Sequence, residues 1–259
     1  MRGAPLTVRP KNLSDLHARY QRLPSRHLDR HVHLWSYGWH GHPVLVFPSA
    51  AGMAHEWQSS GAVEALAPLL RAGRIKLYCP ESNVSEAWTG EGDPRWRLNR
   101  HRAYEAFLLD ELMPHIDRDC RTDFTRVSTV GCSFGAFYAV NTALKYPHRV
   151  DWALGLSGRY DTHTFLHGHS SDDAYFNQPL AYVPGLRGPA LWQVQQTSFT
   201  LVVGQGAYEG RCIQETVRMA RTLEERGIPV HLDAWGHDVS HEWVWWTRQL
   251  RYHFGRRFG

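Results

Sequence analysis

The hydrophobic positions of the chain gather in six short, nearly unbroken runs. Runs of this kind are typical of strands that are buried on both faces, as in a parallel sheet covered by helices. We therefore predict one strand from each run. The runs are PVLVFP (43–48), IKLYCP (75–80), RVSTVG (126–131), DWALGLSG (151–158), SFTLVVG (198–204) and PVHLDAWG (229–236).

The segments between these runs repeat hydrophobic residues at helical spacing. The helices we expect cover residues 60–71, 99–118, 134–145, 211–226 and about 243–254. Strands that alternate with helices indicate an α/β fold with a mainly parallel central sheet flanked by helices. No stretch is rich enough in Pro, Gly or Ser to divide the chain, so we expect residues 1–259 to form a single domain.

Two segments do not fit this alternation of buried strands and helices. The stretch RHVHLWSYG alternates, with Val32 and Leu34 on one face, and predicts an early antiparallel strand after a polar N-terminal arm. Residues 159–195 contain turn residues and aromatics without a clear period. A structureless insert of this length is usually a functional lid or a binding loop.

Composition narrows the classes of function. The chain has 259 residues, of which 42% are hydrophobic and 21% charged, and its formal net charge is +4. Because basic residues are scattered among acidic ones, we expect no nucleic-acid partner. No run is long enough to cross a bilayer, and the first residues lack the apolar stretch of a secretory signal, so we expect no membrane partner.

The four cysteines, Cys79, Cys120, Cys132 and Cys212, show no paired spacing. They indicate free thiols in a reducing compartment, which favours a cytoplasmic protein. Histidines are abundant, and His163, His167 and His169 with Asp172 invite a metal site. A polar loop explains them as well, and we expect neither a metal nor another cofactor.

One serine stands in a setting that points to chemistry. Gly131-Cys132-Ser133-Phe134-Gly135 matches G-x-S-x-G, with a predicted strand before it and a predicted helix after it. In this setting the serine occupies a strained turn and acts as a nucleophile, and the backbone N–H of Phe134 helps to hold an oxyanion. The side chain of Cys132 points elsewhere, and we expect a buried thiol.

A serine nucleophile needs a base and an orienting acid. In α/β folds that carry a G-x-S-x-G turn, these residues follow along the chain in the order Ser, acid, His. The best-placed carboxylate after the run SFTLVVG is Glu209, with Asp233 and Asp238 as alternatives. The loop AWGHDVSHEWVWW offers two histidines, His237 and His241.

The chain resembles the esterase D-like group of the α/β-hydrolase superfamily, which includes S-formylglutathione hydrolases, feruloyl esterases and mycolyltransferases. The likeness runs from about Pro43 to Phe254, and it is closest to a subgroup of bacterial esterases. The segments that carry it are EAFLLDELMPHI, VGCSFGAFYAVNTALKYPHRV, GLSGRYD, AYFNQPLAYVPGL and HEWVWW.

The group's H-D-W-x-x-W motif maps onto His241-Glu242-Trp243 with Trp246 as its last position, so the resemblance favours His241 over His237 as the base. Two positions depart from the group. Glu209 stands where relatives usually carry aspartate, and Pro48-Ser49-Ala50-Ala51-Gly52 replaces a common His-Gly. The resemblance implies that this loop supplies the second oxyanion donor, which we assign to the N–H of Ala50.

The resulting hypothesis is a serine carboxylesterase that hydrolyses small to medium acyl esters through an acyl-enzyme. Trp88 and Tyr160 are expected to line the substrate site, as are Trp57 and Tyr175, although ordinary packing is the alternative for each. The competing functions are a non-catalytic binding module that keeps the serine turn, and an acyltransferase with the same triad. The oligomeric state stays open.

Overall fold

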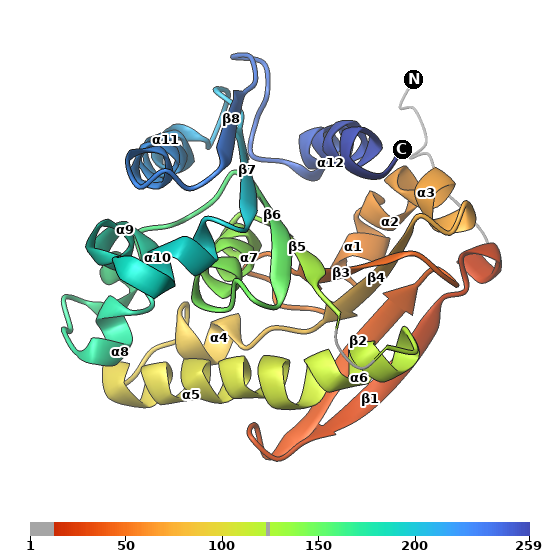
Figure 1. The fold of residues 1–259 in the computed structure, drawn as a ribbon, viewed down its shortest axis with the longest axis horizontal. Coiled ribbons are helices and arrows are strands. Elements are labelled where there is room, and N and C mark those ends of the chain that lie inside the picture. The colour runs from red at the N-terminus through yellow and green to blue at the C-terminus, as the bar shows by residue number, and fades with distance from the viewer. Residues whose placement is uncertain (1–12, 123–124) are drawn as a thin grey trace, which may run out of the picture.

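Eight strands form one sheet in the computed structural model, which describes residues 13–122 and 125–259 (Figure 1). Their order is β1-β2-β4-β3-β5-β6-β7-β8. Strand β2 pairs antiparallel with β1 and β4, and all the other neighbours are parallel, as predicted. The strands are β1 (Arg19–Ser25), β2 (Arg30–Tyr37), β3 (His42–Phe47), β4 (Ile75–Pro80), β5 (Val127–Cys132), β6 (Val150–Leu156), β7 (Ser198–Val203) and β8 (Val230–Ala234).

Helices cover both faces of the sheet and meet two separate hydrophobic clusters. One face carries α1 (Glu56–Ser59), α2 (Ala62–Ala65), α3 (Ala67–Arg71) and α12 (Trp243–Phe258). The other carries α4 (Val84–Ala87), α5 (Pro94–Phe107), the π-helical segment η2 (Leu108–Leu112), α6 (Met113–Asp119), α7 (Phe134–Lys145) and α11 (Gly210–Glu225). No helix among the described residues is long and apolar enough to pass through a lipid bilayer.

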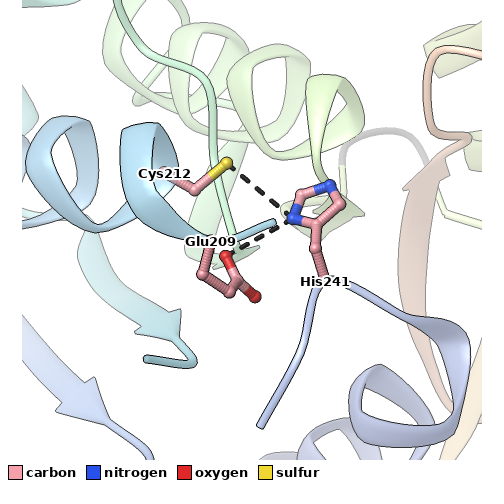
Figure 2. A group of neighbouring side chains, drawn as sticks. All are labelled: Glu209, Cys212 and His241. Carbon is pink, nitrogen blue, oxygen red and sulfur yellow. Dashed lines mark hydrogen bonds and ion pairs between the residues drawn. The ribbon is translucent and has the colours of Figure 1, made fainter. Parts of the chain in front are cut away.

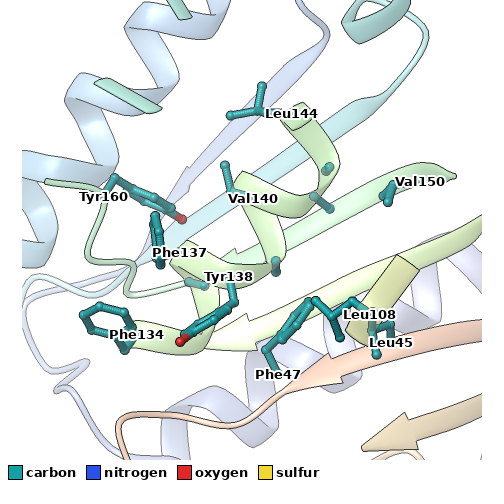
Figure 3. Packing of buried hydrophobic residues seen from close by; sticks show 14 of the residues in the cluster. Leu45, Phe47, Leu108, Phe134, Phe137, Tyr138, Val140, Leu144, Val150 and Tyr160 are labelled. Atoms are coloured by element: carbon teal, nitrogen blue, oxygen red, sulfur yellow. The ribbon is translucent and has the colours of Figure 1, made fainter. Parts of the chain in front are cut away.

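Strand β3 shows why its apolar run is unbroken. Leu45 and Phe47 belong to the cluster beneath α7, whereas Val44 and Val46 belong to the cluster beneath α2 and α12. Successive side chains of a strand point to opposite faces, so a strand covered on both sides must be apolar throughout. Figure 3 shows the α7 side of this packing, where the Tyr138 ring stacks on that of Phe47 with centroids 5.7 Å apart.

Two predicted helices have different boundaries in the structure. The helix expected over 60–71 is split into α2 and α3, because Pro68 lies in the first turn of α3 and lacks the N–H that a continuous helix needs. The helix expected over 99–118 begins earlier, at Pro94, after an Asp93 N-cap whose side chain accepts the N–H of Arg95. It then passes through η2 just before Pro114 interrupts the hydrogen-bond ladder.

The polar arm that precedes the alternating stretch contains a strand that the sequence did not indicate. Strand β1 lies at the edge of the sheet and exposes most of its side chains, so it needs no apolar pattern, and an edge strand tolerates Pro24. The alternating stretch itself is β2, antiparallel as predicted, with Val32 and Leu34 buried.

The sequence predicts a structureless insert at 159–195, and this prediction is wrong. The insert folds into short helical turns. These are η3 (His163–Leu166), α8 (Asp172–Tyr175), α9 (Pro179–Tyr182), η4 (Val183–Gly185) and α10 (Gly188–Val194). Its hydrophobic residues, such as Leu166 and Val183, join the cluster around α7, which explains why its sequence shows no period of its own.

Candidate active site

Ser133 occupies a strained turn between β5 and α7. Its backbone has φ 56° and ψ −118°, a conformation that non-glycine residues rarely adopt. Glycine is required at both flanking positions because other backbone atoms lie too close to them to leave room for a side chain. A Cβ on Gly131 would lie 2.2 Å from the carbonyl carbon and oxygen of Gly135, and one on Gly135 would lie 2.5 Å from the carbonyl oxygens of Phe47 and Pro48. The G-x-S-x-G spacing therefore reflects tight backbone contacts on both sides of the serine.

His241 reaches this serine from the loop between β8 and α12. Its Nε2 lies 3.0 Å from Ser133 Oγ, within hydrogen-bond distance. Its backbone N–H donates to Ala207 O at 3.0 Å, and its ring packs edge-on against Trp246 with centroids 4.8 Å apart. The backbone hydrogen bond and the Trp246 ring thus hold the imidazole in place, with Nε2 facing the serine.

Glu209 approaches the other imidazole nitrogen, with Oε2 3.4 Å from His241 Nδ1 (Figure 2). The side chain is fully buried, at the N-cap position of α11, where the helix dipole favours a negative charge. Its second oxygen, Oε1, accepts the hydroxyl of Ser157 at 2.6 Å. Ser157 in turn accepts the indole N–H of Trp246 at 3.0 Å. This chain of hydrogen bonds sets the direction in which the carboxylate points.

Ser157 was missed by the sequence analysis. It is the third residue of the GLSG stretch and directly follows β6, is fully buried, and has φ 50°. The stretch was visible as part of a family resemblance, but the partner of the hydroxyl comes from a segment 52 residues away. The carboxyl ends of three adjacent parallel strands, β5, β6 and β7, therefore bring Ser133, Ser157 and Glu209 together, at the edge where open α/β sheets place their sites.

The loop after β3 is held by a second buried carboxylate that the sequence analysis did not indicate. Glu56 accepts the backbone N–H of Ser49 at 2.6 Å and its hydroxyl at 2.5 Å. Burial raises the pKa of the Glu56 carboxyl, and the hydrogen bonds from Ser49 oppose that rise. The N–H groups of Ala50 and Phe134 make no hydrogen bond within the described part of the chain, so both remain open to an acceptor.

A model of the "Putative esterase" family matches residues 82–256. The chain belongs to this esterase family. The protein is therefore a hydrolase, as predicted. A search of curated proteins by sequence found no match.

The fold of the esterase is similar to those of many solved structures, among them the following three. A ferulic acid esterase has 15% identity and a TM-score of 0.71, covering 93% of this chain and 97% of that one. An S-formylglutathione hydrolase from Agrobacterium tumefaciens has 16% identity and a TM-score of 0.69, covering 93% and 95%. MPT51 from Mycobacterium tuberculosis has 17% identity and a TM-score of 0.67, covering 92% and 97%. These likenesses establish an α/β-hydrolase fold for the esterase.

The alternative acids and the alternative base lie away from Ser133. Asp233 binds His253, with Oδ2 3.0 Å from Nε2, and accepts the indole N–H of Trp235. His237 and Asp238 are exposed on the loop before His241. Of the candidate acids and bases, it is Glu209 and His241 that the structure brings to Ser133 within the part of the chain that it describes.

Two aromatic residues expected at the substrate site are buried in the esterase. Trp88 is 1% exposed and donates its indole N–H to His101. Tyr160 is 0% exposed, and its side chain lies against Gly155 and Gly158. An added Cβ would be 2.2 Å from its hydroxyl oxygen at Gly155 and 2.2 Å from its ring carbon Cζ at Gly158. Both side chains therefore have packing roles in the structure, and not the predicted position on a pocket wall. Trp57 is also buried, whereas Tyr175 is exposed.

The histidines of the insert that invited a metal interpretation do not form a cluster of three potential ligands among the described residues. His163 and His167 are exposed on the insert, and among the described residues the one cluster of three potential ligands is Glu209, Cys212 and His241. Cys132 is fully buried, as predicted, and burial raises the pKa of its thiol well above the usual value.

Proposed function

We propose that the protein is a serine carboxylesterase in which Ser133 is the nucleophile, His241 the general base and Glu209 the orienting acid. The observation that carries this proposal is the 3.0 Å contact between His241 Nε2 and Ser133 Oγ on a strained strand-to-helix turn. A serine is activated when a base lies within hydrogen-bond distance of its hydroxyl and a third group orients that base.

The reaction begins when Ser133 Oγ attacks the ester carbonyl while His241 Nε2 takes the hydroxyl proton. Glu209 accepts the Nδ1–H and stabilises the imidazolium that forms. The carbonyl oxygen becomes an oxyanion, which the N–H groups of Phe134 and Ala50 bind. His241 then gives its proton to the leaving alcohol, and an acyl group stays on Ser133. Water then attacks the acyl carbonyl while His241 takes its proton. The bond from the acyl carbon to Ser133 Oγ breaks, His241 returns the proton to Oγ, and the acid leaves.

The insert supports a limit on substrate size. The Phe165 ring of η3 packs edge-on against that of Phe134, with centroids 5.0 Å apart, directly beside the nucleophile. The guanidinium of Arg159 lies over the same Phe165 ring at 5.2 Å. We propose that residues 159–195 border the acyl site and restrict it to small or medium acyl groups.

The test is a panel of p-nitrophenyl esters of increasing acyl length, with feruloyl esters and S-formylglutathione included because structures of similar fold carry those names. We expect turnover of the shorter esters, abolished in Ser133→Ala. Ser198→Ala, a serine at the far end of the sheet, is the matched control and keeps the parental rate. Equal rates for Ser133→Ala and the parent would end the assignment.

A further inference from the structure

Cys212 lies beside the triad without a part in the proposed mechanism. It follows Glu209 by three residues on α11, so both side chains leave the same face of the helix. Its side chain is 4% exposed, and its Sγ is 3.8 Å from His241 Nδ1. Figure 2 shows the thiol and the Glu209 carboxylate converging on that one nitrogen from two directions.

The three donor atoms are close enough together to converge on one metal ion. They all lie within 4.8 Å of one another, and Nδ1 is 3.4 Å from the carboxylate oxygen and 3.8 Å from the sulfur. A tetrahedral zinc ion with ordinary bond lengths sets its ligands about 3.3–3.7 Å apart. The Glu209–His241 pair already lies in this range, and the Sγ–Nδ1 pair needs to close by a few tenths of an ångström at most. The pair formed by Sγ and the carboxylate oxygen, which is within 4.8 Å, needs to close by up to about 1.5 Å, a movement that rotation of the two side chains can supply.

The chemistry of the donors selects the ion. A thiolate, an imidazole and a carboxylate suit Zn²⁺ and similar thiophilic ions, whereas Mg²⁺ and Ca²⁺ prefer oxygen ligands alone. Ser157 already holds Glu209 Oε1, which leaves Oε2 directed at the centre of the cluster. Hydrogen bonds of this kind orient the ligands of natural zinc sites.

We propose that Glu209, Cys212 and His241 form a Zn²⁺ site whose occupation switches off the esterase. On binding, Nδ1 and the thiolate coordinate the ion, the thiol proton is released to solvent, and the imidazole proton moves from Nδ1 to Nε2. An imidazole coordinated through Nδ1 carries its proton on Nε2 and has no lone pair there to accept the Ser133 proton. The inhibitory half of this inference rests on the proposed triad, whereas the binding half does not.

Binding is measured first, by titrating the parent, Ser133→Ala, Cys212→Ala and Cys120→Ala with Co²⁺ and with Zn²⁺ in competition with a chelating dye. We expect one ion per chain and a thiolate-to-cobalt charge-transfer band in the parent and in Ser133→Ala. Cys212→Ala loses that band and weakens Zn²⁺ binding by about a hundredfold or more. Cys120, a partly exposed cysteine elsewhere in the fold, is the matched control, and its substitution changes neither. Equal zinc affinity in Cys212→Ala and the parent would overturn the site.

Inhibition is measured next, with each variant compared to its own metal-free rate. Zinc should inhibit the parent reversibly, with a chelator restoring activity, and the inhibition constant of Cys212→Ala should rise in step with its binding constant. Tight binding without inhibition would overturn the switch. An inactive metal-free parent that still binds zinc through Cys212 would instead count against the proposed function and leave the site standing.

Discussion

Replacement of Glu209 by glutamine tests the orienting acid with almost no change of shape. The hydroxyl of Ser157 donates to Oε1 at 2.6 Å and accepts the Trp246 indole at 3.0 Å, so its proton is committed to an acceptor at position 209. The amide oxygen of the glutamine will therefore face Ser157, and its NH₂ will face His241 Nδ1. Nδ1 then becomes the acceptor, and Nε2 carries the proton toward Ser133.

This reversed tautomer cannot act as a general base. In enzymes that use a Ser-His-acid arrangement, the wrong tautomer lowers kcat by about 10⁴-fold, equivalent to about 5.4 kcal/mol at 1.36 kcal/mol per decade. Glu209→Asp is the matched control, because it keeps the charge and displaces it by about one methylene, which costs up to about 10²-fold. We expect the loss in Glu209→Gln to fall on kcat and not on KM.

The assay is steady-state hydrolysis of a short p-nitrophenyl ester, with thermal unfolding of each variant as a check on folding. A Glu209→Gln enzyme within about tenfold of the parent would refute the reasoning, since an enzyme whose base depends on this carboxylate cannot lose only that much. A larger loss in Glu209→Asp than in Glu209→Gln would refute it as well, because it would place shape above charge.

Three further predictions concern a glycine beside the serine, the indole of Trp246 and a carboxylate outside the active site. Gly135→Ala puts a Cβ 2.5 Å from two backbone carbonyl oxygens and should lower the free energy of unfolding by about 1–3 kcal/mol or more. The control is Gly255→Ala in α12, whose Cβ meets nothing within 4 Å and should not destabilise the protein. Equal melting temperatures for the two variants would contradict this. Trp246→Phe removes the indole donor to Ser157 and should lower kcat by up to about tenfold, with KM unchanged; a rise in KM alone would argue against a positioning role. Burial alone would raise the pKa of Asp119, but hydrogen bonds from neighbouring cations and a tyrosine outweigh it and hold that pKa well below the usual range. The stabilising effect of Asp119 is therefore present above its unfolded pKa and lost as pH falls, so the stability difference between Asp119→Asn and the parent should narrow below about pH 4; a constant difference in urea midpoints would contradict this.

The elements that the sequence predicted best are those whose burial leaves a local pattern. The parallel strands appear as apolar runs because both faces are covered, and the turn at Ser133 appears because close backbone contacts require glycine at two fixed positions. Strand β1 left no such pattern, since an edge strand with exposed side chains is free of that constraint.

The sequence predicts a site residue where a motif fixes both its type and its position, as at Ser133. His241 was separated from His237 only by resemblance to a family motif, because both histidines occupy the same loop. Ser157 and Glu56 could not be found, since a buried serine or glutamate gains its role from a partner that folding brings near. Trp88 was misplaced because an aromatic residue after a strand can pack inward as readily as it can line a pocket.

The central claim is that one serine is activated by its neighbours. Intact-mass and peptide analysis after treatment with a fluorophosphonate probe tests this most directly, because the probe reacts only with an activated hydroxyl. The account predicts a single adduct on Ser133 that is absent from Ser133→Ala and strongly slowed in His241→Ala. A folded parent that takes up no label, or takes it up at another serine, would contradict it.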